Sequence, residues 1–285
     1  MKIKMKKEKI YQNKFVNTLL LFDTKEAEFT DKCERKYKVD DDLCVFASLP
    51  DIYDGKYTIN DFMFSSTTKR LLVYLIMKFT NLSEQERLAG EIEFTVKEFM
   101  ELCNLKDRDN TKRMIEKDLF SLFCIRAEWN GCEIFIIEDF KSGRGKFTGI
   151  IDPTFADNLM KFKGIVLLPI SYFMIPINRT PEASGWLLFL IYLTYKNSKS
   201  TNKNRISVNS LLSRSSFMSI DEIRNTSNCS VKERVTFPLI RNLNSLSETF
   251  EFKYFSKTGR ELTERQLQNL TYDELIKVII HYETK

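Results

Sequence analysis

A chain of 285 residues with 43% hydrophobic content is long enough for about two domains of ordinary size. It has no run of about eighteen apolar residues that could span a membrane, and its lysine-rich start leads into no apolar signal segment, so we expect a cytoplasmic protein with no membrane partner. The net charge of +5 is mild, so nucleic-acid binding must be judged from the positions of the basic residues.

The first 62 residues combine a basic start with an acidic continuation. Lysine dominates residues 1–14, whereas three consecutive acids, Asp40, Asp41 and Asp42, lie in the acidic part. The apolar patches of this region are short and broken by charges. We interpret residues 1–62 as a basic tail and an accessory arm.

A helical pattern begins at Ser65. Apolar residues then recur every three or four positions as far as Phe79, behind Ser and Thr residues that can cap the helix. After a polar linker, Glu91–Phe94 alternates like a strand. Thr95 and Glu98 then have the spacing of a capping box, which predicts the start of a second helix.

A third helix and a hairpin complete a first module. The second helix should end at Asn104, and the third is expected over Asn110–Phe123. Strands at Ile134–Glu138 and Phe147–Ile151 follow, joined by a loop rich in glycine and basic residues. This order of elements is that of a winged helix, so we predict a winged-helix domain over residues 63–163.

Residues 164–285 repeat this order of elements without repeating the sequence. The predicted elements are a helix at Pro181–Lys196, a strand at Arg205, a short helix capped by Ser207, a long helix at Ser230–Leu246, and strands at Phe250–Phe255 and Lys277–Tyr282. A helical stretch between the last two strands elaborates the second wing. The predicted fold class is therefore α+β and helix-rich, with two tandem winged-helix domains behind an N-terminal arm.

Residues that could support catalysis or hold a cofactor are few. None of the six cysteines forms a C-x-x-C pair, so we expect reduced, mostly buried thiols and no bound metal. The single histidine, His281, lies in an alternating strand pattern, and the loop from Gly143 lacks the spacing of a phosphate-binding loop. We expect no cofactor and no enzymatic activity. A metal-dependent nuclease or nicking enzyme built on Asp40–Asp42 is a lesser alternative.

Basic residues gather instead on elements that could meet DNA. In the first module they lie on the third helix and on the hairpin loop, where they could reach base edges and phosphates. In the second, Lys196–Arg214 contains no acidic residue, and the long helix has two arginines seven positions apart, which predicts that both face one side. The candidate DNA-binding residues are Arg108, Lys112, Arg113, Lys117, Lys141, Arg144, Lys146, Arg205, Lys232, Arg234 and Arg241.

Four segments resemble the iteron-binding initiators of plasmid replication. Residues 64–72 (FSSTTKRLL), residues 94–103 (FTVKEFMELC) and the glycine-rich wing that ends in residues 151–153 (IDP) resemble the first module of that family. Residues 234–244 (RVTFPLIRNLN) resemble its second recognition helix, which a proline also interrupts. A proline inside a helix costs about 3 kcal/mol unless its surroundings compensate. The resemblance implies that the first module supports dimerisation and phosphate contact, and that the second reads the DNA through Arg234, Arg241 and Lys232.

We therefore expect a sequence-specific, double-stranded DNA-binding replication initiator that acts at origin repeats of a plasmid, phage or integrative element. Its expected partners are repeated DNA sites, a second copy of the chain and host replication proteins. A winged-helix transcriptional regulator is the alternative, because it too needs only helices that read a groove.

Overall fold

The computed structural model describes residues 7–20, 28–29, 34–39, 41–49, 57–161, 164–200, 204–215 and 231–285. The chain divides into two compact units, Met1–Met174 and Ile175–Lys285. Within the described residues, no helix is both long and apolar enough to cross a membrane. The unit boundary lies about ten residues beyond the position expected from the sequence, and we describe each unit by itself.

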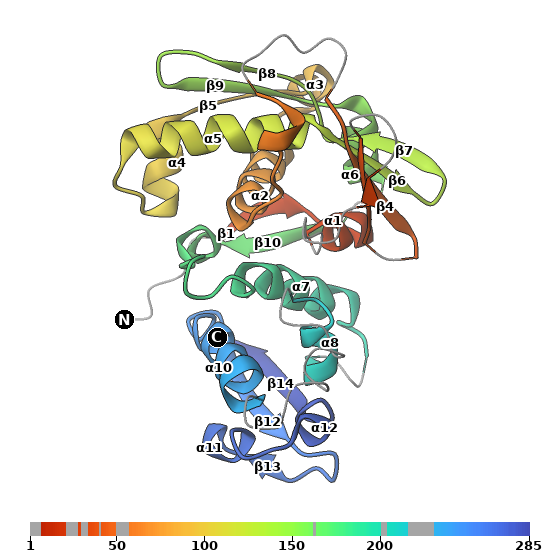
Figure 1. Ribbon diagram of the computed structural model, residues 1–285, viewed down its shortest axis with the longest axis vertical. Coiled ribbons are helices and arrows are strands. Elements are labelled where there is room, and N and C mark those ends of the chain that lie inside the picture. Colours follow the sequence, from red (N-terminus) through yellow and green to blue (C-terminus); the bar gives the residue numbers. More distant parts are fainter. Residues whose placement is uncertain are drawn as a thin grey trace. The chain divides into compact units, whose positions relative to one another are not determined.

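A bundle of helices forms the centre of the first unit. α2 (Ser66–Thr80) begins at Ser65, whose side chain accepts a hydrogen bond from the Thr68 N–H, and it buries Leu71, Leu75 and Phe79 completely. α3 (Glu84–Ala89) follows and ends at Gly90, which adopts a positive φ of 65° beside the Ile151 backbone. α5 (Arg108–Phe123) lies between α2 and the sheet that carries the wing (Figure 1).

The winged-helix order predicted for the first module is present. β5 (Glu91–Thr95) leads into α4 (Val96–Cys103), which ends at Asn104 in the left-handed conformation. α5 (Arg108–Phe123) starts two residues before the predicted helix because Asp107 caps it, accepting a hydrogen bond from Asn110 N. β8 (Ile137–Ser142) and β9 (Lys146–Ile151) form the hairpin, in a sheet of order β5-β9-β8.

An additional hairpin was not predicted. β6 (Ile125–Trp129) pairs with β7 (Cys132–Phe135), so the strand expected at Ile134–Glu138 is divided at Ile136 between two sheets. Asn130 and Gly131 both have positive φ, as a tight hairpin turn requires. The chain therefore turns back before it enters the wing.

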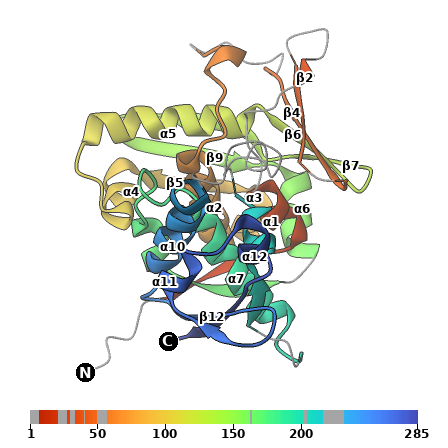
Figure 2. The same cartoon turned by 60° about the horizontal axis from the view of Figure 1, so that its bottom comes forward.

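The N-terminal segment belongs to the first unit and is not a separate arm. β1 (Lys7–Tyr11) pairs with β10 (Ile165–Pro169), which holds both ends of the unit together. β4 (Leu43–Ala47) pairs with β6 in a five-stranded sheet of order β2-β3-β4-β6-β7, where β4 and β6 lie side by side (Figure 2). The unit's other elements are α1 (Lys14–Leu19), β2 (Glu28–Phe29), β3 (Arg35–Lys38), η1 (Ile59–Asp61), α6 (Pro153–Lys161) and η2 (Ile170–Met174).

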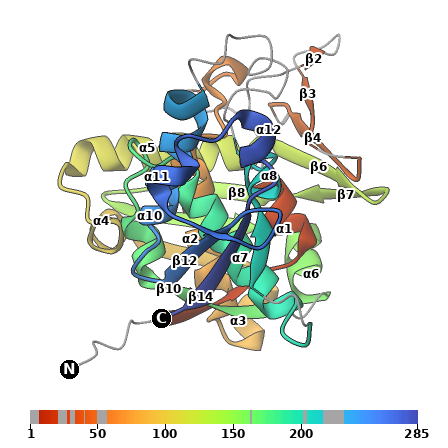
Figure 3. The ribbon, with the colours of Figure 1, turned by 90° about the horizontal axis from the view of Figure 1, so that it is seen from below.

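The second unit packs helices on one face of a four-stranded sheet of order β11-β14-β12-β13, in which β12 and β14 lie side by side (Figure 3). Trp186, Leu239 and Ile280, from two helices and a strand, are almost completely buried in its core. The elements are α7 (Ala183–Lys196), β11 (Arg205–Ser207), α8 (Val208–Leu212), η4 (Lys232–Thr236), α10 (Phe237–Asn244), β12 (Phe250–Phe255), β13 (Glu261–Leu262), α11 (Glu264–Leu267), α12 (Tyr272–Leu275) and β14 (Ile279–Thr284).

Candidate DNA interface

The first half of α5 presents basic side chains to solvent. Arg108 and Arg113 are exposed, whereas Lys112 and Lys117 are partly buried. The Lys112 ammonium lies 3.8 Å from Glu116 on the next turn of α5. Lys117 lies on the opposite side of the helix from the wing tip, close to Asp61 in η1. Hydrogen bonds from Thr58 lower the pKa of Asp61, and the charge of Lys117 lowers it further.

The wing tip lies against the start of α5. Gly145 has a φ of +83°, and a methyl group added there would come within 3.0 Å of the Arg108 guanidinium. Ser142 on β8 donates a hydrogen bond of 2.7 Å to Glu116 on α5. The helix and the hairpin therefore form one surface, on which Arg108 lies next to the wing tip.

Three predicted wing residues, Lys141, Arg144 and Lys146, are exposed. Lys146 is engaged within the sheet, because its ammonium lies 2.6 Å from Glu93 on β5. Arg144 lies in the turn between β8 and β9, where Gly143 N donates a hydrogen bond to Lys146 O. Arg144 therefore stands furthest out on the hairpin, as a residue that contacts a DNA backbone should.

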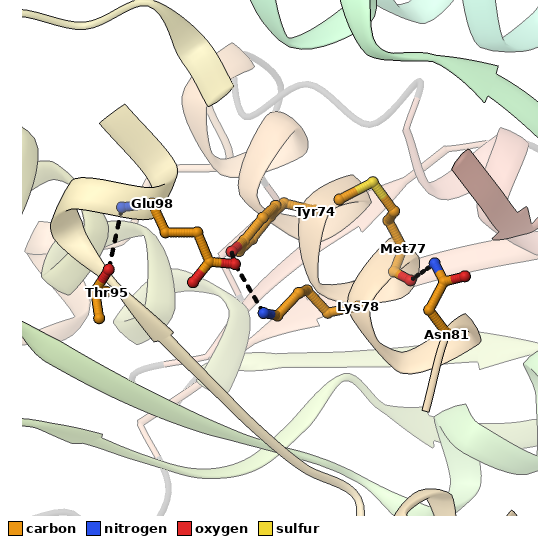
Figure 4. Close-up of polar contacts among 6 residues, drawn as sticks. All are labelled: Tyr74, Met77, Lys78, Asn81, Thr95 and Glu98. Carbon is orange, nitrogen blue, oxygen red and sulfur yellow. Dashed lines mark hydrogen bonds and ion pairs between the residues drawn. The ribbon is translucent and has the colours of Figure 1, made fainter. Parts of the chain in front are cut away.

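Glu98 fixes α4 to α2 (Figure 4). Its N–H donates to the Thr95 side chain, as a capping box requires, but its carboxylate does not turn back to Thr95. Instead it accepts hydrogen bonds from Tyr74 (2.9 Å) and Lys78 (2.8 Å) on α2. Burial favours the neutral acid, but these hydrogen bonds outweigh it and lower the pKa of Glu98. Only half of the predicted capping box forms, since the other half is exchanged for contact between helices.

A buried carboxyl group connects α5 to the start of α2. Asp118 Oδ1 accepts hydrogen bonds from Thr68 (2.6 Å) and Thr67 (3.1 Å), the latter two in the first turn of α2. Burial raises the pKa of Asp118 to about 7, although the two hydroxyls and nearby Lys117 act in the opposite direction. Sequence reasoning missed this residue. Its position between Ile115 and Leu119 on the inner side of α5 was the available signal.

The long helix predicted in the second module has two different halves. Residues Lys232–Thr236 form a π-helical turn, in which Phe237 N donates to Lys232 O five residues earlier, and only Phe237–Asn244 is α-helical. Lys232, Arg234 and Arg241 are all exposed. A π-turn takes more residues per turn than an α-turn, so Arg234 is rotated about the helix axis relative to Arg241 when compared with a regular α-helix. That both arginines face one side stays a prediction.

Asn242 holds this helix in place. Its side chain is 1% exposed and accepts hydrogen bonds from the backbone N–H groups of Glu182 (3.1 Å) and Ala183 (3.0 Å), where α7 begins. Its amide donates 2.8 Å to the carbonyl of Pro238. α7 has no cap from its own chain segment, so an asparagine of α10 supplies it.

Arg205 lies on a different element, the edge strand β11. Its Cα partner across the ladder is His281 on β14, which in turn pairs with Lys253 on β12. The three side chains form a row on one face of the sheet. Burial lowers the pKa of His281, and the charge of Arg205 lowers it further.

Part of the first compact unit matches a known protein family. Residues 53–174 match the family described as initiator replication protein, WH1. These residues, somewhat less than half of the chain, are therefore similar to the WH1 module of replication initiators. The match ends where the first compact unit ends, at Met174.

Two solved structures share the fold of the chain. One is the Pi initiator protein in complex with iteron DNA, with 10% identity, a TM-score of 0.50, and coverage of 77% of this chain and 91% of that one. The other comprises domains 2 and 3 of RctB, with 10% identity, a TM-score of 0.51, and coverage of 94% and 98%. At this identity the likeness concerns the fold, and it confirms tandem winged-helix domains. A comparison with curated protein sequences gave no match.

Proposed function

We propose that the chain is a replication initiator that binds repeated double-stranded DNA sites at an origin. The observation that carries this proposal is the WH1 family match over residues 53–174. It is supported by the fold shared with the Pi initiator, whose structure contains iteron DNA, and by exposed cations on both winged-helix units. The first unit would contribute Arg108, Arg113 and Arg144, and the second Arg234 and Arg241.

The direct test is binding of the purified chain to DNA from around its own gene. We expect binding to direct repeats near the reading frame, with an affinity that falls steeply as salt increases, since each neutralised phosphate makes the slope of log K against log salt more negative by about 0.9. A shuffled duplex of equal length is the control. Equal affinity for both duplexes would contradict the proposal.

A second experiment separates an initiator from a transcriptional regulator. A plasmid without an origin should replicate when it receives the gene together with the adjacent repeats, and it should fail when the repeats are removed. A chain that binds the repeats but supports no replication would be a regulator instead.

We also infer that the chain acts by binding and performs no cleavage, and that it pairs with a second copy and with host replication proteins at the origin. Among the described residues, no cluster of three or more His, Cys, Asp or Glu side chains could hold a metal. Asp41 and Asp42 are paired with Lys38 and Lys14 respectively, and Asp40 lies outside the described residues. Cleavage of repeat DNA in the presence of Mg²⁺ or Mn²⁺ that disappears on mutating Asp40, Asp41 and Asp42 would overturn the inference about chemistry.

A further inference from the structure

In the second unit, the π-turn of η4 lies directly before α10, and Pro238 in α10 accounts for it. Pro238 has no N–H to donate, and the ring of a proline crowds the carbonyl four residues earlier, which here belongs to Arg234. The preceding backbone responds by widening into the π-turn of η4, where the N–H of Phe237 reaches Lys232 O. The helix thus continues through the proline without breaking.

The core holds this wide turn from both sides. On its N-terminal side Val231 is 6% exposed, within it Val235 is fully buried, and beyond it Leu239 is fully buried as well. Asn242 attaches α10 to the start of α7. The π-turn is therefore a fixed part of the packed helix, unlike the frayed turn at a free end.

The solvent side of the same turn consists of charged residues. Lys232, Glu233 and Arg234 are all exposed, and the Lys232 ammonium lies 5.3 Å from the centre of the Phe237 ring, which limits its direction. A π-turn is an α-turn with one residue inserted, and such turns occur frequently at functional sites. The extra residue rotates everything before it relative to Arg241.

We propose that this π-turn determines the DNA sequence preference of the second unit. It rotates Lys232 and Arg234 about the helix axis relative to Arg241, so that the two sets of cations meet different positions of the DNA site. This inference rests on the proposed function. Base edges in the major groove are read by hydrogen bonds of defined geometry, whereas phosphate contacts carry no sequence information. A change of direction within the helix should therefore alter preference more than overall affinity.

Deletion of Glu233 tests the proposal, because it removes the inserted residue. The spacing of Val231 and Val235 then changes from four residues to three, and both spacings keep the two side chains on one helix face. The spacing between Val235 and Leu239 does not change, because both lie after the deleted residue. The matched control is Glu233→Ala, which removes the same side chain and keeps the turn. Thermal melting of both variants establishes that they fold.

The readout is the affinity for the chain's own repeat and for a shuffled duplex, at one salt concentration. We expect the deletion to reduce the preference for the repeat by about tenfold or more and to change the affinity for the shuffled duplex by less than about threefold, while Glu233→Ala keeps the preference of the unmodified chain. Equal preference in all three proteins would overturn the inference, and so would the same loss in the deletion and in Glu233→Ala. If the unmodified chain shows no preference, the proposed function itself fails.

Discussion

At the scale of single residues, polar groups that are buried with specific partners hold in place the helices that carry the candidate DNA-binding residues. Asn242 is the strongest case, because it is 1% exposed and its side chain makes three hydrogen bonds to the backbone. Asn242→Ala removes the side-chain acceptor of the Glu182 and Ala183 N–H groups, although the Ala183 N–H keeps the Thr180 carbonyl at 3.2 Å. Since an unsatisfied buried group costs about 1–3 kcal/mol, we expect the free energy of unfolding to fall by roughly that amount, as measured by urea denaturation.

Asn244, which is exposed at the end of the same helix, provides the control for this prediction. Asn244→Ala should change stability by less than about 0.5 kcal/mol. Similar effects of the two substitutions would show that Asn242 does not act as a cap.

Asp118 makes stability depend on pH. Burial raises its pKa from 3.8 to about 7 in the folded chain, so the folded state holds a proton that the unfolded state has released. The stability contributed by this group is therefore present below about pH 4, is lost as pH rises towards 7, and stays lost above it. Asp118→Asn removes the charge, so its advantage over the unmodified chain should grow from near zero at pH 4 to roughly 2–4 kcal/mol at pH 8.

Urea denaturation at several pH values measures this effect. Asp109→Asn, an exposed position in the first turn of the same helix, is the control and should leave the pH dependence unchanged. A constant difference between Asp118→Asn and the unmodified chain from pH 4 to pH 8 would contradict the assignment.

At the scale of elements, the wing and α5 act as one surface through Gly145. A side chain at this position meets both a positive φ and the Arg108 guanidinium at 3.0 Å. Gly145→Ala should therefore cost about 1–2 kcal/mol of stability and displace Arg108, which would weaken binding to any duplex. Gly143→Ala is the matched control, because its nearest neighbour would be 3.7 Å away and its φ is not positive. Equal duplex binding by both variants would separate Arg108 from the DNA surface.

Sequence patterns predicted the regular elements well and their exceptions poorly. The ends of α4 at Thr95 and Asn104 followed from local capping rules. The Asn130-Gly131 turn carried a usable hairpin signal that the strand pattern around Ile134 concealed. The carboxylate of Glu98 depends on contact with another helix, on which local rules contain no information. Pro238 indicated an irregular helix but did not specify that the irregularity is a π-turn.

At the scale of the whole molecule, the candidate site residues fall on two compact units that are separate in the chain, so DNA binding should combine two different kinds of contact. On the first unit, Arg144 stands at the wing tip and suits a phosphate better than Lys146, which is paired with Glu93. On the second, Arg241 is exposed on a helix that Asn242 holds firmly. The prediction that the first unit contacts phosphates and the second reads bases can therefore be tested in one protein.

We expect Arg144→Ala to weaken binding to the repeat and to a shuffled duplex alike, and to lower the salt slope by about 0.9, since one phosphate contact is lost. Arg241→Ala should weaken binding to the repeat alone, by about 1–3 kcal/mol, with a smaller effect on the shuffled duplex. Because the two residues share no partner, the double variant should show the sum of both losses to within about 0.5 kcal/mol. Titration of each protein with both duplexes at several salt concentrations measures these quantities. Suppose instead that Arg241→Ala lowered the affinity for both duplexes equally and that Arg144→Ala lowered the affinity for the repeat alone. The first unit would then read the sequence, and the second would contact the DNA backbone.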